Sequence, residues 1–204
     1  MGNENNNLLK EQFSRPQIAA TINSYMRSPK RMFEFLGSGI GAEYYAEKLE
    51  DLRSIVLCER DKEKRDSWKK SGRHAKLPIK DKCLFEDAIE VFELIEKSPI
   101  KFNVVNLDFC TFFYDNGKEN CTAAIIRKVF EKKAIEKEGL MCFTFQVTGL
   151  GVNMHKTALK TKEDILNEIQ LLAKPYGYGV EEVYSYIYKA SKPTRMLNLI
   201  IKAI

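Results

Sequence analysis

A glycine-rich turn between two apolar runs constrains this chain more than any other feature. An apolar run over 32–36 enters Gly37-Ser38-Gly39-Ile40-Gly41, a helical pattern covers 42–52, and a second apolar run over 54–58 ends at Glu59. A strand, a glycine turn, a helix, a strand and an acid form the opening unit of a nucleotide-binding sheet. Glycines allow the sharp turn and a close ligand approach, and the free N–H groups of the helix start favour an anionic group.

Glu59 adds a second signal, because it comes 22 residues after Gly37, where the second predicted strand ends. A carboxylate at this place can accept hydrogen bonds from both hydroxyls of a ribose. The spacing Gly37-x-Gly39-x-x-Ala42 also fits the dinucleotide fingerprint. A nicotinamide-dependent oxidoreductase therefore remains an alternative at this point, as does a tight turn beside a solvated acid.

Helical patterns and apolar runs alternate along most of the chain. The predicted helices cover 8–27, 41–52, 61–71, 87–97, 119–137 and 161–174, and 71–80 reads as a loop. The predicted strands cover 31–36, 54–58, 82–85, 101–107, 140–147, 182–189 and 196–203. No helical pattern separates the last two strands, so we expect them to pair antiparallel. The prediction is an α/β fold: a doubly wound, mostly parallel seven-stranded sheet with a C-terminal antiparallel hairpin. Residues 1–29 form an N-terminal helical extension, and residues 30–204 form one domain.

Composition narrows the class of protein. The chain has 204 residues, of which 44% are hydrophobic, and it has no apolar run long enough to cross a bilayer. Its amino terminus is polar and does not resemble a secretory signal. The five cysteines show no C-x-x-C spacing and the two histidines are far apart, so we expect neither a disulfide framework nor a metal site. These features predict a cytoplasmic protein with no membrane association.

Positive charge is concentrated just after the second predicted strand. Residues 60–82 hold ten Lys/Arg and four Asp/Glu, a net charge of +6, whereas the whole chain carries +5. A basic stretch of this kind can bind a phosphate backbone, although such a face is often only solvated. The sequence therefore predicts nucleic acid as a possible partner through segment 60–82.

Further acids complete a set of motifs. Asp87, followed by Ala88, comes after the third predicted strand, and Asp108 ends the fourth. With Gly37-x-Gly39-x-Gly41 and Glu59 before them and a hairpin at the end, the chain resembles the class I S-adenosylmethionine-dependent methyltransferases over roughly residues 30–204. That family usually has an acid two residues before the first glycine. Here Phe35 stands in that position and Glu34 precedes it.

The resemblance implies a role for each of these residues. Gly37, Ser38, Gly39 and Gly41 would pass beneath the methionine and ribose of S-adenosylmethionine. Glu59 would hold the ribose hydroxyls, and Asp87 with Ala88 would contact the adenine. Asp108 would face the reacting centre as the catalytic residue and orient an amine or accept its proton. The alternatives are a helix N-cap for Asp87 and a turn residue for Asp108.

Aromatic residues follow Asp108 and could contact a flat substrate. Phe109 and Phe112 could stack on a base or close the core, and Cys110 could be a covalent nucleophile or an ordinary loop thiol. Arg73 and His74 lie in the predicted loop and could contact the substrate. The favoured hypothesis is a methyltransferase acting on a nucleic-acid base. The alternatives are an NAD(P)-binding oxidoreductase and a non-catalytic binding or partner subunit.

Overall fold

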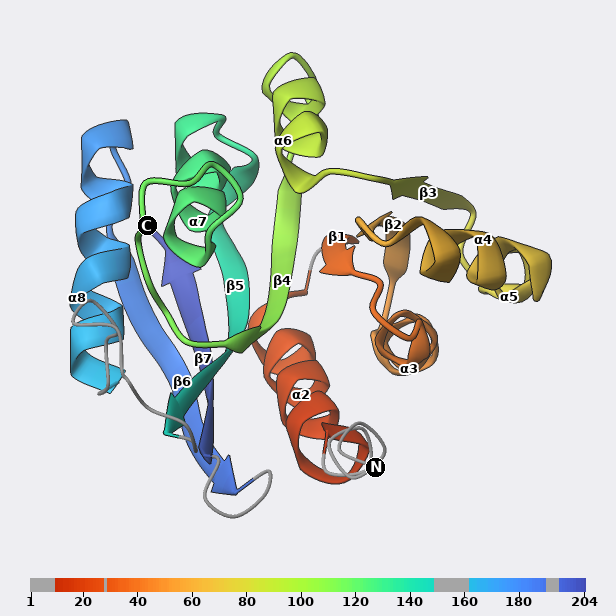
Figure 1. The fold of residues 1–204 in the computed structure, drawn as a ribbon, viewed down its shortest axis with the longest axis horizontal. Helices are drawn as coiled ribbons and strands as arrows, with labels where there is room; N and C mark the ends of the chain where they lie inside the picture. Colours follow the sequence, from red (N-terminus) through yellow and green to blue (C-terminus); the bar gives the residue numbers. More distant parts are fainter. Residues whose placement is uncertain (1–9, 28, 149–161, 190–194) are drawn as a thin grey trace.

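The computed structural model describes residues 10–27, 29–148, 162–189 and 195–204. One seven-stranded sheet has the order β3-β2-β1-β4-β5-β7-β6 (Figure 1). Its strands are β1 Lys30–Phe35, β2 Leu52–Cys58, β3 Asp81–Phe85, β4 Phe102–Thr111, β5 Ile135–Thr148, β6 Val180–Lys189 and β7 Arg195–Ala203. Strands β1 to β5 pair in parallel, and β7 lies antiparallel to both β5 and β6. The expected doubly wound sheet with its C-terminal hairpin is therefore confirmed.

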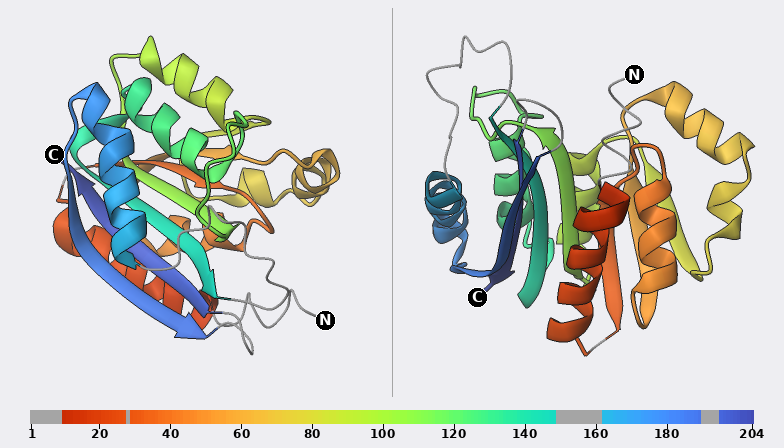
Figure 2. Two further views of the ribbon diagram at one scale, coloured as in Figure 1. Left: turned by 60° about the vertical axis from the view of Figure 1, so that its left-hand side comes forward. Right: turned by 90° about the horizontal axis from the view of Figure 1, so that it is seen from below.

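Helices cover both faces of the sheet (Figure 2). One layer holds α2 Arg15–Tyr25, preceded by the π-helical turn η1 Lys10–Ser14, and α3 Ile40–Lys48. The helices α4 Lys62–Lys70 and the short α5 Arg73–Lys76 lie on the same face of the sheet, near β2 and β3. The opposite layer holds α6 Ala88–Glu96, α7 Thr122–Glu131 and α8 Lys162–Ala173, which ends in the 3-10 turn η2 Lys174–Tyr176. In the described part of the chain, no helix has the length and apolarity needed to cross a membrane.

Two hydrophobic cores result from the period of two in the strands. In β1, Met32 packs into the core beneath α2 and α3, whereas Phe33 packs into the core beneath α6, α7 and α8. In β4, Val104 and Val105 divide in the same way. Because both faces are buried, the inner strands are continuous apolar runs, as expected for parallel strands under two helical layers.

Several boundaries differ from the sequence-based expectation; helix α3, for example, ends at Lys48 and β2 already begins at Leu52. Strand β4 continues to Thr111, because pairing with β5 resumes there after an irregularity that begins at Asp108. Helix α7 ends at Glu131, where Lys133 takes a φ of +47°, and β5 already begins at Ile135. The predicted loop over 71–80 contains the four-residue helix α5. Residues 149–161, which include His155, lie outside the described residues.

Candidate functional site

The glycine turn connects β1 to α3 at the carboxyl end of the parallel strands. Gly37 and Gly39 have φ values of +51° and +80°, in the left-handed region that favours glycine. The Gly39 N–H donates to the Leu36 carbonyl at 2.6 Å, which closes the turn. Gly37 and Ser38 are exposed, so their backbone can be reached by a ligand, whereas Gly39 is buried.

Internal packing explains why glycine stands at positions 39 and 41. A Cβ atom on Gly39 would lie 2.3 Å from Nε1 of Trp68, and one on Gly41 would lie 2.3 Å from Oε1 of Glu34. Trp68, on α4, is only 4% exposed and presses its indole against the turn. Two of the glycines that a motif assigns to a cofactor therefore also accommodate this protein's own side chains.

Neither residue before the turn supplies an acid at the strand end. The Phe35 ring packs against the rings of Phe33 and Phe109, with centroid distances of 5.7 and 5.6 Å. Glu34 points to the opposite face and is 4% exposed, and its Oε2 accepts a hydrogen bond from Asn106 Nδ2 at 3.1 Å. Glu34 is thus part of the buried interface beneath α2 and α3.

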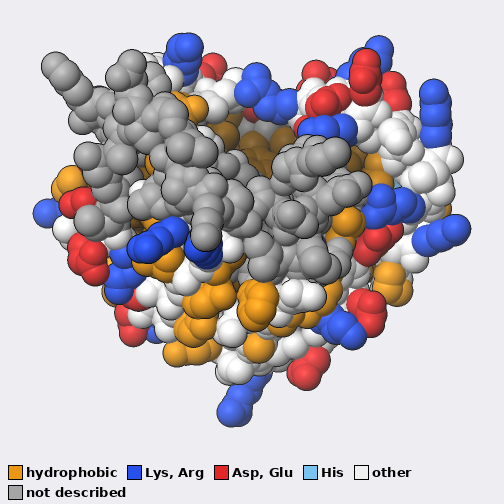
Figure 3. Space-filling model, turned by 60° about the horizontal axis from the view of Figure 1, so that its bottom comes forward, with side chains coloured by type: hydrophobic (Ala, Val, Ile, Leu, Met, Phe, Trp, Pro, Cys, Tyr) orange, Lys and Arg blue, Asp and Glu red, His pale blue; other side chains and the backbone are white. Residues whose placement is uncertain are grey.

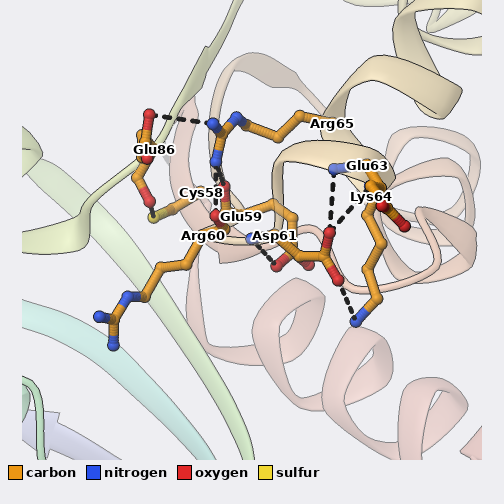
Figure 4. A network of polar contacts seen from close by, with 8 residues as sticks. All are labelled: Cys58, Glu59, Arg60, Asp61, Glu63, Lys64, Arg65 and Glu86. Carbon is orange, nitrogen blue, oxygen red and sulfur yellow. Dashed lines mark hydrogen bonds and ion pairs between the residues drawn. The ribbon is translucent and has the colours of Figure 1, made fainter.

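Glu59 follows β2 and is half-buried. Its Oε1 accepts a hydrogen bond from the Asp61 N–H at 2.9 Å. Asp61 in turn caps α4 by accepting from the N–H groups of Glu63 and Lys64, at 2.9 and 3.2 Å. Figure 4 shows the exposed Arg60 side chain pointing away from this group of residues. Among the described residues Glu59 Oε2 accepts no hydrogen bond, which leaves it for a ligand.

Asp87 caps α6, as the alternative interpretation expected. Its Oδ1 accepts from the Ile89 N–H at 2.7 Å, and Ala88 beside it is 5% exposed. Capping does not exclude a ligand, because a carboxylate can accept further bonds through its second oxygen. Close by, burial and the charges of Asp87 and Glu59 raise the pKa of Cys58 to about 12, so this thiol stays protonated and unreactive.

Asp108 lies on β4 and is half-buried, with Thr144 of β5 as its register partner. The Phe109 ring stacks on Phe145 at 5.8 Å and also contacts Phe35, so it belongs partly to the core. Phe112 is half-buried. The Cys110 side chain lies outside the described part of the structure.

Arg73 and His74 lie on α5, beside the glycine turn. The Arg73 guanidinium forms two bonds of 2.6 Å with the Glu43 carboxylate and donates to the Ser38 carbonyl at 3.0 Å. These bonds lower the pKa of Glu43. The His74 ring lies edge-on to Trp68 at 5.2 Å. Burial, followed by the charges of Lys82 and Lys69, lowers the pKa of His74, so its imidazole is neutral near pH 7.

A cavity of about 420 Å³ opens between the glycine turn and α4. Its lining residues are Gly37, Ser38, Asp61, Glu63, Lys64, Ser67, Trp68, Ser71 and Arg73. It shares the exposed part of the turn with the predicted site but includes neither Glu59, Asp87 nor Asp108. Figure 3, which turns the carboxyl ends of the parallel strands forward, shows a hollow on that side with hydrophobic side chains at its floor.

The structure therefore brings the predicted cofactor residues together at the carboxyl ends of the parallel strands. The glycine turn, Glu59 and Asp87 follow the adjacent strands β1, β2 and β3, and Asp108 lies near the end of β4 on the other side of β1. The sequence-based reasoning missed Arg65 as a part of this site, because it treated this residue as one charge in a basic stretch.

Solved structures share this architecture, although no protein-family model and no curated protein matches the sequence. Trm5b from Pyrococcus abyssi superposes with a TM-score of 0.60 at 12% identity, covering 93% of this chain and 48% of that one. TYW2 from P. horikoshii, in complex with MeSAdo, gives a TM-score of 0.62 at 12% identity, covering 100% of this chain and 64% of that one. An rRNA methylase from Streptococcus thermophilus gives 0.55 at 13% identity, covering 92% of this chain and 95% of that one.

Two of these matching structures belong to longer proteins, since the chain spans about half of Trm5b and less than two thirds of TYW2. At 12–13% identity the likeness concerns the fold. Sheet order, both helical layers and the antiparallel β7 agree with it. This chain has the Rossmann-like fold of the class I S-adenosylmethionine-dependent methyltransferases.

Proposed function

We propose that this chain is an S-adenosylmethionine-dependent methyltransferase that acts on a nucleic-acid base. One observation carries the proposal. The glycine turn, Glu59, Asp87 and Asp108 all lie at the carboxyl edge of neighbouring strands, where ligands bind in open α/β sheets. The antiparallel β7 between β5 and β6 supports this reading over the oxidoreductase alternative. The fold alone would leave the reaction open.

The residues at this edge suit an adenosine-containing ligand. Glu59 has Oε2 available for ribose hydroxyls, and Asp87 has an oxygen beyond the one that caps α6. Gly37 and Ser38 present exposed backbone at the end of β1. Strand β1 contributes no acid for an amino group, because Phe35 is apolar and Glu34 is buried on the other side.

The chain's part in the reaction is alignment. S-adenosylmethionine supplies an activated methyl on a sulfonium sulfur, and the transfer is a displacement that requires the acceptor in line with it. Glu59 and Asp87 orient the adenosine, and the glycine turn lets the backbone approach it. Asp108, half-buried near the end of β4, holds the acceptor amine and takes its proton as the new bond forms. Phe109 and Phe112, which are both half-buried, would form an apolar wall that excludes water.

The nucleic-acid part of the proposal depends on charge. Three of the ten cationic residues in 60–82 are engaged internally: Arg65 with Glu86, Arg73 with Glu43, and Lys82 with three backbone carbonyls. The other seven are all exposed, although Lys64 also pairs with Asp61 at 3.8 Å: Arg60, Lys62, Lys64, Lys69, Lys70, Lys76 and Lys80. Lys64 lines the cavity beside the glycine turn, which brings this basic surface to the edge of the site. An rRNA methylase with the same fold is consistent with such a substrate.

A methyl-transfer assay tests the activity. The purified chain is incubated with tritiated S-adenosylmethionine and total tRNA, rRNA, DNA or protein. We expect label in one nucleic-acid pool and its loss in Asp108→Ala. Label in protein alone would contradict the substrate, and cofactor binding without transfer to any pool would favour the non-catalytic alternative.

Binding to RNA is tested separately with a charge-reversed surface. Lys62→Glu combined with Lys69→Glu and Lys70→Glu should weaken binding and flatten its salt dependence, because each lost phosphate contact lowers the salt slope by about one. The matched control reverses Lys97, Lys133 and Lys137, which are equally exposed but lie elsewhere. Equal losses in the two triple variants would refute a specific role for segment 60–82.

A further inference from the structure

The side chain of Arg65, on α4, joins the ends of two strands that carry the predicted cofactor acids. Its Nη1 donates to the carbonyl oxygens of Glu59 and Arg60, at 2.5 and 2.8 Å, and its Nη2 donates to Glu86 Oε2 at 2.9 Å (Figure 4). Glu59 follows β2, and Glu86 stands between β3 and Asp87. One guanidinium therefore contacts both segments that would hold an adenosine.

These bonds lie just beyond the point where the hydrogen bonds of the sheet end. The bonds between β2 and β3 end where the Glu59 N–H donates to the Phe85 carbonyl at 3.1 Å. Immediately beyond it, the direction in which Glu59 and Arg60 leave the sheet depends on their own carbonyl bonds to Arg65. A planar guanidinium fixes direction better than an ammonium, since its donors form a rigid fork.

Burial makes this clamp stronger than an ordinary surface pair. The Arg65 side chain is 11% exposed, although the Glu86 side chain is 68% exposed. Two of the three bonds go to backbone carbonyls, which do not rotate away as a surface carboxylate does. The guanidinium is thus held by the main chain, and the exposed partner is secondary.

From this geometry we propose that Arg65 is a positioning residue of the adenosine site, which sets the orientation of Glu59 and its separation from Asp87. The inference rests on the proposed cofactor and extends it to a residue that contacts no ligand. Arg65 acts through Glu59. Replacing Arg65 weakens the binding of adenosine-containing ligands. Once Glu59 itself has been replaced, replacing Arg65 as well weakens binding little further.

The chain offers a matched control, Arg31, at the amino ends of the strands. Arg31 is also a half-buried strand clamp: its Nε donates to the Lys101 carbonyl at 2.8 Å and its Nη2 pairs with Glu136. Its side chain is 27% exposed. Because it lies at the amino ends of the strands, Arg31→Met removes a comparable clamp far from the predicted site. A general loss of stability would appear in both variants.

Calorimetric titration with S-adenosylhomocysteine tests the proposal, with circular dichroism to establish that each variant is folded. We expect Arg65→Met to weaken binding roughly tenfold or more, as loss of one well-placed charged contact does. Arg65→Lys, which keeps the charge but loses the fork, should fall between this value and the wild type. Arg31→Met should bind within about twofold of the wild type. If Arg65→Met does not fold, the comparison of Arg65→Lys with Arg31→Met decides.

A double substitution separates positioning from a structural role. If Arg65 acts through Glu59, Glu59→Ala with Arg65→Met should bind about as weakly as Glu59→Ala alone. Independent, multiplying losses would overturn the proposal, as would unchanged affinity in Arg65→Met or equal losses in Arg31→Met. A wild-type chain that binds no S-adenosylhomocysteine would instead overturn the proposed function, and this inference with it.

Discussion

Replacing Gly39 by alanine should destabilise the protein more than replacing Gly37, although the two glycines share one turn. Both have positive φ, so each alanine is strained by about 1–2 kcal/mol. A Cβ on Gly37 meets nothing within 4 Å, whereas one on Gly39 would lie 2.3 Å from Nε1 and 2.8 Å from Cδ1 of Trp68. A rigid, buried indole cannot yield easily, and overpacking of this kind costs about 1–3 kcal/mol. Adding the two costs gives roughly 2–5 kcal/mol for Gly39→Ala.

Urea denaturation followed by circular dichroism measures both variants, provided that the slope m is unchanged between them. The difference between the two alanine variants isolates the steric cost, since the backbone strain is common to both. In a Trp68→Leu background the penalty at Gly39 should fall to the value measured at Gly37, because the ring atoms that collide are gone. Equal free energies of unfolding for the two variants would refute this explanation of Gly39, and so would a penalty that survives in the Trp68→Leu background.

Two further outcomes follow from the same corner of the molecule. Because burial and two lysines hold the pKa of His74 below 6.5, the unfolded chain binds this proton more readily. The contribution of His74 to the free energy of unfolding is therefore fully present above about pH 6.5, and it is lost as the pH falls towards the pKa of His74 in the folded protein. His74→Asn should remove that part of the slope of unfolding free energy against pH, and an unchanged slope would contradict it. Trp68 is the one tryptophan of the sequence, so its fluorescence should change on titration with S-adenosylhomocysteine and give the calorimetric dissociation constant. A flat titration in a chain that binds by calorimetry would place the ligand away from the turn.

The order and kind of the elements could be predicted because their signals are local. The apolar run before Gly37, the acid after the second run and the missing helix before the last strand each lie within a short window. They were enough to predict the parallel sheet and its antiparallel end. The extension of β4 to Thr111 could not be predicted, because it depends on pairing with Phe145 of β5, whereas the local aromatic sequence is equally typical of a loop.

The surroundings of the glycine turn could not be predicted for a similar reason. Arg73 pairs with Glu43, which is 30 residues away, and Trp68 contacts Gly39 across a comparable separation. In the sequence Arg65 and Arg73 are two charges in a basic stretch. In the structure they are internal clamps, and only the exposed cations around them are left for a partner. Residue type identified the candidates, but tertiary contacts divide the structural cations from the available ones.

Binding of S-adenosylhomocysteine to the purified chain tests the central claim most directly. Isothermal titration calorimetry should give one saturable site in the wild type. Glu59→Ala should lose about 1.5–3 kcal/mol of binding free energy, which is the contribution of a hydrogen bond to a charged group. This loss corresponds to a dissociation constant roughly tenfold to 150-fold larger. Glu93→Ala, which removes an exposed acid on α6 outside the predicted site, should bind as the wild type does. No binding by the wild type, or equal binding by Glu59→Ala, would contradict the account.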